Sequence, residues 1–145
     1  MKSTSKTRKN ADKFIYHEDF TSAPPDTIFV FGSNLAGFHG AGAALAAYNW
    51  YGAKLGIGEG LMGQSYAIPT KDVEIQTRPM ECIVESIKSF VEFTHLAPHL
   101  KFFVTRVGCG LAGLKDCDIA PLFAGALNCS FPEPWKEYLE ACEEE

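Results

Sequence analysis

The sequence predicts a single α/β domain with a mixed, largely parallel sheet, and two observations support this prediction. Short apolar runs rich in β-branched and aromatic residues alternate along the chain with longer segments of helical character, which is typical of α/β folds. Three glycine-rich segments, at 32–42, 56–63 and 108–113, follow or adjoin such apolar runs. Because ligands of open α/β sheets bind beyond the carboxyl ends of the strands, we expect these segments to converge on one ligand site.

The first half of the chain predicts three strands and one helix. Short apolar runs at 14–16 and 28–31 suit strands, and the second run is apolar enough to be buried. The alanine-rich run at 41–51 predicts a helix that Gly52 ends. Residues 65–70 form the third expected strand, ending near a proline. We expect the aromatic residues of the helix to pack on the sheet or rim the site, with Trp50 in the core: Tyr48, Trp50 and Tyr51.

The second half predicts a long amphipathic helix and then shorter elements. Apolar residues recur at helical spacing over 79–95, with proline at the start of the segment. We expect this helix to cover the sheet and to carry no chemistry. Asp116 or Asp118 is placed to cap the next helix. The remaining expected elements are a strand at 100–107, a helix at 119–124, a strand at 127–131 and a helix at 134–142.

Length, composition and charge bound the domain organisation and the partners. The chain has 145 residues, of which 46% are hydrophobic, and this fits one globular domain. Its net charge of −5 does not favour nucleic-acid binding by the whole domain. No apolar run is long enough to span a bilayer, and none follows the basic start as in a signal peptide. We expect a flexible basic arm at 1–13, one domain at 14–142 and an acidic tail at 143–145.

Cysteine and histidine usage indicates neither a disulfide framework nor a metal site. The five cysteines are odd in number and form no C-x-x-C pair. The four histidines are scattered, and Pro98 interrupts the helix that would align His95 with His99. We therefore expect no metal and no cofactor. A reducing cytoplasm is the simplest compartment for such a chain.

The stretch 28–47 is the strongest functional signal. It reads as a strand, a glycine-rich loop and the start of a helix. Backbone N–H groups are unpaired at a helix start, the helix dipole is positive there, and glycines let a phosphate approach closely. The order G-x-x-G-x-G matches neither a Walker A loop nor the G-x-G-x-x-G fingerprint. This stretch therefore predicts one wall of a site for a phosphate-bearing ligand, and a tight turn without a ligand is the alternative.

Several motifs in order resemble those of the macro domain, the ADP-ribose-binding module. Gly32-Ser33-Asn34 followed by 40–43, read G-A-G-A, resembles the family's N-A-A-N and glycine-rich segment. The stretch 107–111, read V-G-C-G-L, resembles its second diphosphate loop, and 17–21, read H-E-D-F-T, resembles its G-D-I-T. The loop 108–111 and the segment 66–71 look closest to the terminal ADP-ribose protein glycohydrolase branch. The resemblance spans about 14–127 and implies a macro-domain-like three-layer α/β/α sandwich.

The resemblance implies a role for each matching residue. Asp19 would accept a hydrogen bond from the adenine amino group, and Phe20 would contribute a backbone N–H beside it. Asn34 would lie near the distal ribose. One face of the diphosphate would be held by Gly40, Ala41 and Gly42. The other face would be held by Gly108, Cys109, Gly110 and Leu111, with Ala112 directly after them. Amides and dipoles can hold a diphosphate without an arginine clamp.

The sequence matches the family's catalytic residues less completely than its binding residues. In the glycohydrolase branch a lysine after a strand attacks the distal ribose and an aspartate after G-C-G-L assists; Lys71 matches the lysine, but Ala112 occupies the aspartate position. A nucleophilic lysine needs a lowered pKa or a partner, and Asp116 could substitute for the missing acid. His39, beside the first glycine segment, could serve as an acid or base. Cys109 lies among backbone N–H groups expected to lower a thiol pKa, which makes it a minor nucleophile candidate.

Three functional hypotheses remain open from the sequence. The first is a protein that binds ADP-ribose or a related nucleotide, with hydrolysis of an ADP-ribosyl bond as a further activity. The second is a binding module that reads an ADP-ribose-derived signal without turnover. The third is a Rossmann-like nucleotide-binding protein, which Asp72 matches poorly because it follows Gly42 by about thirty residues rather than about twenty. The expected partner is ADP-ribose or an ADP-ribosylated substrate. Nucleic acid would enter only as such a substrate or through the basic arm, and no membrane is expected.

Overall fold

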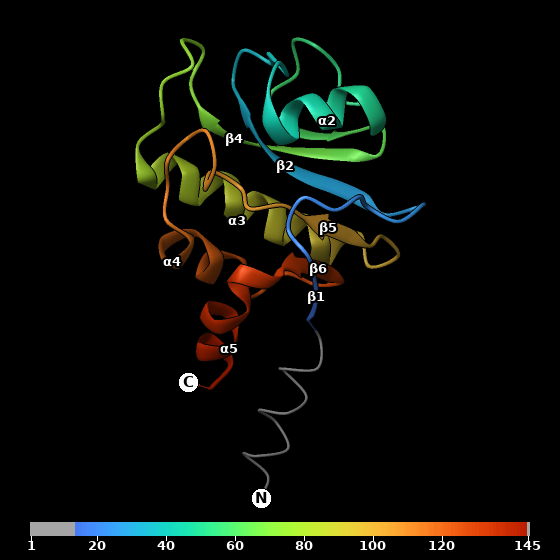
Figure 1. The fold of residues 1–145 in the computed structure, drawn as a ribbon, viewed down its shortest axis with the longest axis vertical. Coiled ribbons are helices and arrows are strands. Elements are labelled where there is room, and N and C mark those ends of the chain that lie inside the picture. The colour runs from blue at the N-terminus through green and yellow to red at the C-terminus, as the bar shows by residue number, and fades with distance from the viewer. Residues whose placement is uncertain (1–13, 145) are drawn as a thin grey trace, which may run out of the picture.

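A six-stranded sheet organises the fold of residues 14–144, which the computed structural model describes with side chains as far as residue 141. The strand order is β1-β6-β5-β2-β4-β3, and neighbours are parallel except for the antiparallel pair β3 and β4 (Figure 1). The predicted α/β class with a mixed, largely parallel sheet is confirmed. The strands are β1 (Ile15–His17), β2 (Ile28–Asn34), β3 (Gly60–Met62), β4 (Ser65–Lys71), β5 (Phe102–Val104) and β6 (Cys129–Pro132).

Alternating side chains on the central strands build a hydrophobic cluster on each face of the sheet. On β2, Val30 enters one cluster while Phe29 and Phe31 enter the other. On β5, Phe102 and Phe103 divide in the same way. This two-residue period is what a strand imposes on its side chains, and strands covered on both faces read as continuous apolar runs.

Helices cover both faces of this sheet. The described residues form four α-helices, α2 (Gly42–Trp50), α3 (Met80–Leu96), α4 (Asp116–Ile119) and α5 (Lys136–Glu144), and two 3₁₀ helices, η1 (Ala120–Phe123) and η2 (Glu133–Trp135). Helix α2 packs through small residues, including Ala44 and Ala47, into the cluster that contains Phe29. Helices α3, η1 and α5 pack into the opposite cluster, as Figure 1 lets the reader follow.

The structure confirms most expected elements and corrects three. The helix expected at 79–95 is α3, and Gly52, with φ +77°, follows the end of α2. The strand expected at 100–107 is shorter, because the chain turns into a loop after β5. Strand β3 lies inside a segment expected to be a loop. Neither Asp116 nor Asp118 caps the following helix, since Lys115 occupies the cap position and makes no side-chain cap bond.

The basic arm expected at 1–13 lies outside the described residues. Helix α5 continues to Glu144, into the stretch expected to be an acidic tail. Over 14–144, no helix has both the length and the apolar character needed to cross a membrane.

Candidate functional site

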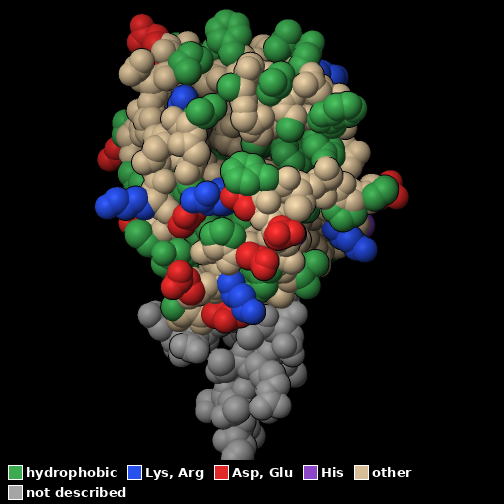
Figure 2. All heavy atoms as spheres, viewed as in Figure 1, with side chains coloured by type: hydrophobic (Ala, Val, Ile, Leu, Met, Phe, Trp, Pro, Cys, Tyr) green, Lys and Arg blue, Asp and Glu red, His purple; other side chains and the backbone are tan. Residues whose placement is uncertain are grey.

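A cavity of about 900 Å³ lies at the carboxyl ends of the parallel strands and extends over the sheet to Phe29 and Phe103. Residues just after β1, β2, β4 and β5 line it, and helix α2 borders it on one side. Figure 2 shows hydrophobic side chains gathered over the upper part of this face, where the surface is hollowed. The register of β2 against β4 shifts between Ser33 and Asn34, so the sheet is irregular where it meets the cavity. This is the position at which ligands bind open α/β sheets.

The first glycine-rich segment forms one wall of this cavity. The side chain of Asn34 bonds both ways to Phe38, donating from Nδ2 to the carbonyl at 2.8 Å and accepting the N–H at Oδ1 at 2.9 Å. Asn34 therefore lines the cavity, but both polar groups of its side chain are hydrogen-bonded within its own loop. Gly40, Ala41 and Gly42 follow on the wall, and a Cβ at Gly40 would meet nothing within 4 Å.

Helix α2 begins at this wall with exposed N–H groups. Its first residue is Gly42, and Ala41 supplies no side-chain cap. The first backbone bond of the helix runs from Leu45 N–H to the Ala41 carbonyl at 3.2 Å. The amides of the preceding turn thus have no partner within the helix and carry the positive end of its dipole.

The third glycine-rich segment forms the facing wall. Gly108 adopts φ +75°, and Gly110 has open space where a Cβ would project. Leu111 lies exposed on the rim, and its Cδ1 would be 3.4 Å from a Cβ at Gly42. The two glycine segments therefore meet at this contact and leave their backbones facing the cavity.

The second glycine-rich segment, expected on the same crevice, does not line the cavity. It packs behind the first segment instead: Gly56 N–H bonds the Gly37 carbonyl at 3.1 Å, and Ser33 donates from its hydroxyl to the Gly58 carbonyl. A Cβ on Gly58 would lie 2.1 Å from the Asn34 carbonyl oxygen. The glycines here allow two backbones to touch, so the segment supports the wall without forming it.

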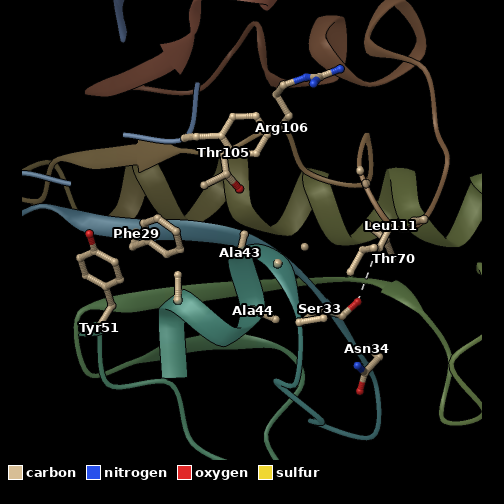
Figure 3. Close-up of a pocket in the computed structure, with 18 of the residues that line it drawn as sticks. Phe29, Ser33, Asn34, Ala43, Ala44, Tyr51, Thr70, Thr105, Arg106 and Leu111 are labelled. Atoms are coloured by element: carbon tan, nitrogen blue, oxygen red, sulfur yellow. Dashed lines mark hydrogen bonds between the residues drawn. The ribbon is translucent and has the colours of Figure 1, made fainter. Parts of the chain in front are cut away.

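A row of four stacked rings lines the other end of the cavity. His17 stacks on Phe103 with centroids 3.7 Å apart, Phe103 lies 6.1 Å from Phe29, and Phe29 stacks on Tyr51 at 4.3 Å. Figure 3 shows Phe29 and Tyr51 on one side of the cavity, with Thr70 and Leu111 on the other. The expectation that Trp50 lies in the core is wrong, because it is 77% exposed and lines the cavity.

Arg106 lines the cavity and pairs with two carboxylates, those of Asp19 and Asp116. Sequence reasoning did not single out this arginine. Its Nη2 lies 2.6 Å from Asp116 Oδ2 and its Nη1 lies 3.4 Å from Asp19 Oδ2. Trp135 donates from Nε1 to Asp116 Oδ1 at 2.7 Å. Partial burial acts to raise the pKa of Asp116, but the hydrogen bonds from Arg106 and Trp135 outweigh it and hold that pKa below the ordinary value. Asp116 is therefore a charged anchor for Arg106, outside the cavity lining.

Of the residues expected to catalyse, only Lys71 lines the cavity. His39 is buried behind the wall, where its Nε2 lies 2.8 Å from the Lys54 carbonyl and 3.1 Å from the Ile57 carbonyl. Two carbonyl acceptors require Nε2 to carry the proton, so His39 holds the two loops together. Ala112 lines the cavity and offers no side-chain acid.

Cys109 is not the activated thiol that its loop suggested. Its Sγ donates to the Val107 carbonyl at 3.4 Å, and the residue is absent from the cavity lining. Burial raises the pKa of the Cys109 thiol to about 12, and the nearby Asp116 charge acts in the same direction. The expected lowering of its pKa is therefore wrong, because burial and the Asp116 charge disfavour the thiolate.

The free energy of unfolding is expected to fall as the pH drops below about 6.5, in part through His17. Burial lowers the pKa of His17, outweighing the hydrogen bond to Val104 and the charge of Asp19. The unfolded chain then binds a proton more readily than the folded chain in this pH range. His17→Asn should flatten the decline in urea-unfolding free energies measured between pH 7 and pH 5, with His99→Asn as an exposed control. An unchanged decline in His17→Asn would contradict this.

Comparison with known proteins adds no assignment to this site. Searches against protein-family models, curated proteins and solved structures found no match. Among the described residues, no three His, Cys, Asp or Glu side chains gather as a metal ion would require.

Proposed function

We propose that the chain is a macro-domain-like three-layer α/β/α protein that binds ADP-ribose or a related ADP-ribosyl nucleotide. The observation that carries the proposal is the pair of glycine-rich walls facing one cavity, with open space at Gly40 and Gly110. A diphosphate needs close approach to backbone N–H groups, and both walls offer backbone where a side chain would block it.

The rest of the cavity suits the remainder of such a ligand. Its volume of about 900 Å³ lies near the upper end of the range of small-molecule sites, about 300–1,000 Å³. The ring row from His17 to Tyr51 offers an apolar planar surface to a nucleobase, and Asp19 offers a carboxylate beside it. Lys71, the last residue of β4, lies at the opposite end, where a distal ribose would reach.

Two features argue against the Rossmann-like alternative. The strand order β1-β6-β5-β2-β4-β3 differs from the 3-2-1-4-5-6 order of that fold. Asp72, which would have to hold ribose hydroxyls, accepts the N–H groups of Glu74 and Gln76 at 2.9 and 3.0 Å. The Asp72 carboxylate therefore orders its own loop, and this is not the role that a ribose-binding acid has in a Rossmann-like site.

Calorimetric titration with ADP-ribose tests the proposal, with AMP and NAD titrated in parallel. We expect a Kd near micromolar, which corresponds to about 8 kcal/mol. Asp19→Ala should weaken binding. Gly110→Ala should weaken it by about tenfold without loss of stability, because Gly110 lines the cavity, a Cβ there meets nothing within 4 Å, and a methyl group would hinder the approach of a diphosphate to this backbone. Gly125→Ala, outside the cavity and in ordinary contact with Val91, is the control. The absence of binding to all three nucleotides would exclude the proposal.

Hydrolysis of an ADP-ribosyl bond is the second candidate function, and the position of Lys71 on the cavity favours it. Its weakness is the lack of an acid, since Asp19 is the one carboxylate among the described lining residues and it pairs with Arg106. A turnover assay on ADP-ribosylated protein and nucleic acid separates the two functions. Turnover that Lys71→Ala abolishes, with ADP-ribose affinity retained, would establish an enzyme. Intact binding without turnover would establish a binding module.

A further inference from the structure

Two bulky residues on the cavity rim hold a backbone conformation that their side chains disfavour. Among the described residues, four that are not glycine have positive φ: Phe20 at 64°, Asp26 at 63°, Ile75 at 65° and Asn128 at 56°. Asp and Asn enter this left-handed region readily, whereas a bulky aromatic or β-branched residue there is an outlier. Phe20 and Ile75 both line the cavity, whereas Asp26 and Asn128 do not.

Phe20 gains no packing in return for this strain. The residue is 96% exposed. The turn around it is nevertheless well defined, because Phe20 N–H bonds Asp19 Oδ1 at 3.0 Å and Thr21 donates to the Glu18 carbonyl at 2.6 Å. Arg106 holds the other Asp19 oxygen. The turn thus presents a free phenyl ring at the end of the cavity that the stacked rings line.

Ile75 is held at the other end by a comparable turn. Ile75 N–H bonds the Asp72 carbonyl at 3.1 Å, and Asp72 Oδ1 accepts the N–H groups on either side of Ile75. Thr77 then donates to the Ala112 carbonyl at 3.1 Å, which ties this turn to the third glycine segment. Ile75 remains 39% exposed.

Strain in a bulky residue persists where the surrounding structure imposes it, and such residues concentrate at ligand clamps and active sites. The geometry points to Phe20 and Ile75 as specificity-determining side chains that contact the two ends of the bound ligand. This inference rests on the proposed function. Phe20 stacks on the nucleobase, and Ile75 packs on the hydrocarbon face of the distal ribose.

The sheet separates these two contacts by a distance that suits an extended dinucleotide-like ligand. Phe20 follows β1 and Ile75 follows β4, and these strands are four steps apart in the sheet order. Adjacent strands are about 4.8 Å apart, so the two strands are separated by about 19 Å. A mononucleotide would reach only one of the two side chains. Affinity for AMP is therefore expected to depend on Phe20 and not on Ile75.

Asparagine substitutions test this inference, because asparagine accepts the left-handed region but offers neither a ring nor an apolar branch. Phe20→Asn is expected to raise the melting temperature by about 2–4 °C through relief of strain, and to raise the Kd for ADP-ribose and for AMP about tenfold. Ile75→Asn is expected to raise the Kd for ADP-ribose alone. Phe20→Tyr should retain affinity. Asp26→Asn, at a position of positive φ away from the cavity, should change neither Kd.

The outcomes separate this inference from the function on which it rests. Failure of the unmodified chain to bind ADP-ribose would overturn both. Binding that neither asparagine substitution weakens would overturn this inference alone, and so would a loss of affinity accompanied by a lower melting temperature in both variants. If only one of the two substitutions weakened binding, the contact at that residue would be supported and the contact at the other residue would be excluded.

Discussion

Replacement of Gly58 by alanine is expected to lower the free energy of unfolding by about 3 kcal/mol, at the upper end of what overpacking usually costs. The added Cβ would lie 2.1 Å from the Asn34 carbonyl oxygen and 2.9 Å from the Leu35 Cα. Both atoms belong to the backbone, so no side chain can rotate away. The two loops would have to separate, and the bond from Ser33 to the Gly58 carbonyl would break with them.

Ligand binding is expected to fail in the same variant, because the displaced backbone leads into the first glycine wall. Urea unfolding followed by circular dichroism measures the stability, and titration with ADP-ribose measures the binding. Gly110→Ala is the matched control for stability, since a Cβ there meets nothing within 4 Å and the change should stay within about 0.5 kcal/mol. A Gly58→Ala protein with an unchanged midpoint would show that the loops do not touch as described.

This contact explains why sequence reasoning misread the second glycine segment. A run of glycines signals that a backbone is approached closely, but not whether a phosphate or another strand of the chain approaches it. In the first and third segments, Gly40 and Gly110 line the cavity. In the second, Gly58 faces the Asn34 carbonyl. Which group approaches a glycine backbone is decided by the tertiary structure. A glycine-rich run therefore looks alike in the sequence whether it faces a ligand or another segment of the chain.

The sheet was more predictable than the site because its signal is local. The alternation of Phe29 and Val30 between two faces is a property of any strand, and it requires no knowledge of the neighbouring strands. Strand β3 escaped prediction because three residues beside glycines carry little periodicity, and its pairing with β4 supplies the structure. Trp50 was misplaced for a related reason: a helical position does not reveal which side of the helix meets a cavity.

Arg106 shows most clearly what the sequence alone could not reveal about the site. It follows β5 as a single charged residue before a glycine loop, and nothing near it in sequence marks a partner. Its two carboxylate partners are 87 and 10 residues away, and the indole that completes the network is 19 residues beyond Asp116. The sequence did indicate Asp116 as functional, but the structure makes it the anchor of an arginine and not an acid in the cavity.

Removal of Arg106 is therefore expected to cost both stability and affinity. Arg106→Met leaves the Asp116 carboxylate, whose side chain is 21% exposed, without its cationic partner, while Trp135 still donates to it. Breaking a buried pair costs about 3–5 kcal/mol and an exposed one far less, so we expect a loss of about 2 kcal/mol at this partly buried site. Asp19 also loses its cationic partner, so the turn that presents Phe20 loosens, and the Kd for ADP-ribose should rise.

A double-mutant cycle with Asp116→Asn distinguishes an ion pair from general damage. If the uncompensated Asp116 charge dominates the cost, the double variant should lose less stability than the two single losses added together, with a coupling of at least about 1 kcal/mol. Additive losses would mean that Arg106 stabilises the fold through its packing or its contact with Asp19, and not through Asp116. Affinity follows a separate logic, because neutralising Asp116 leaves Asp19 and Arg106 in place. Asp116→Asn should therefore retain more affinity than Arg106→Met, and the reverse order would exclude a role for Arg106 in orienting Asp19.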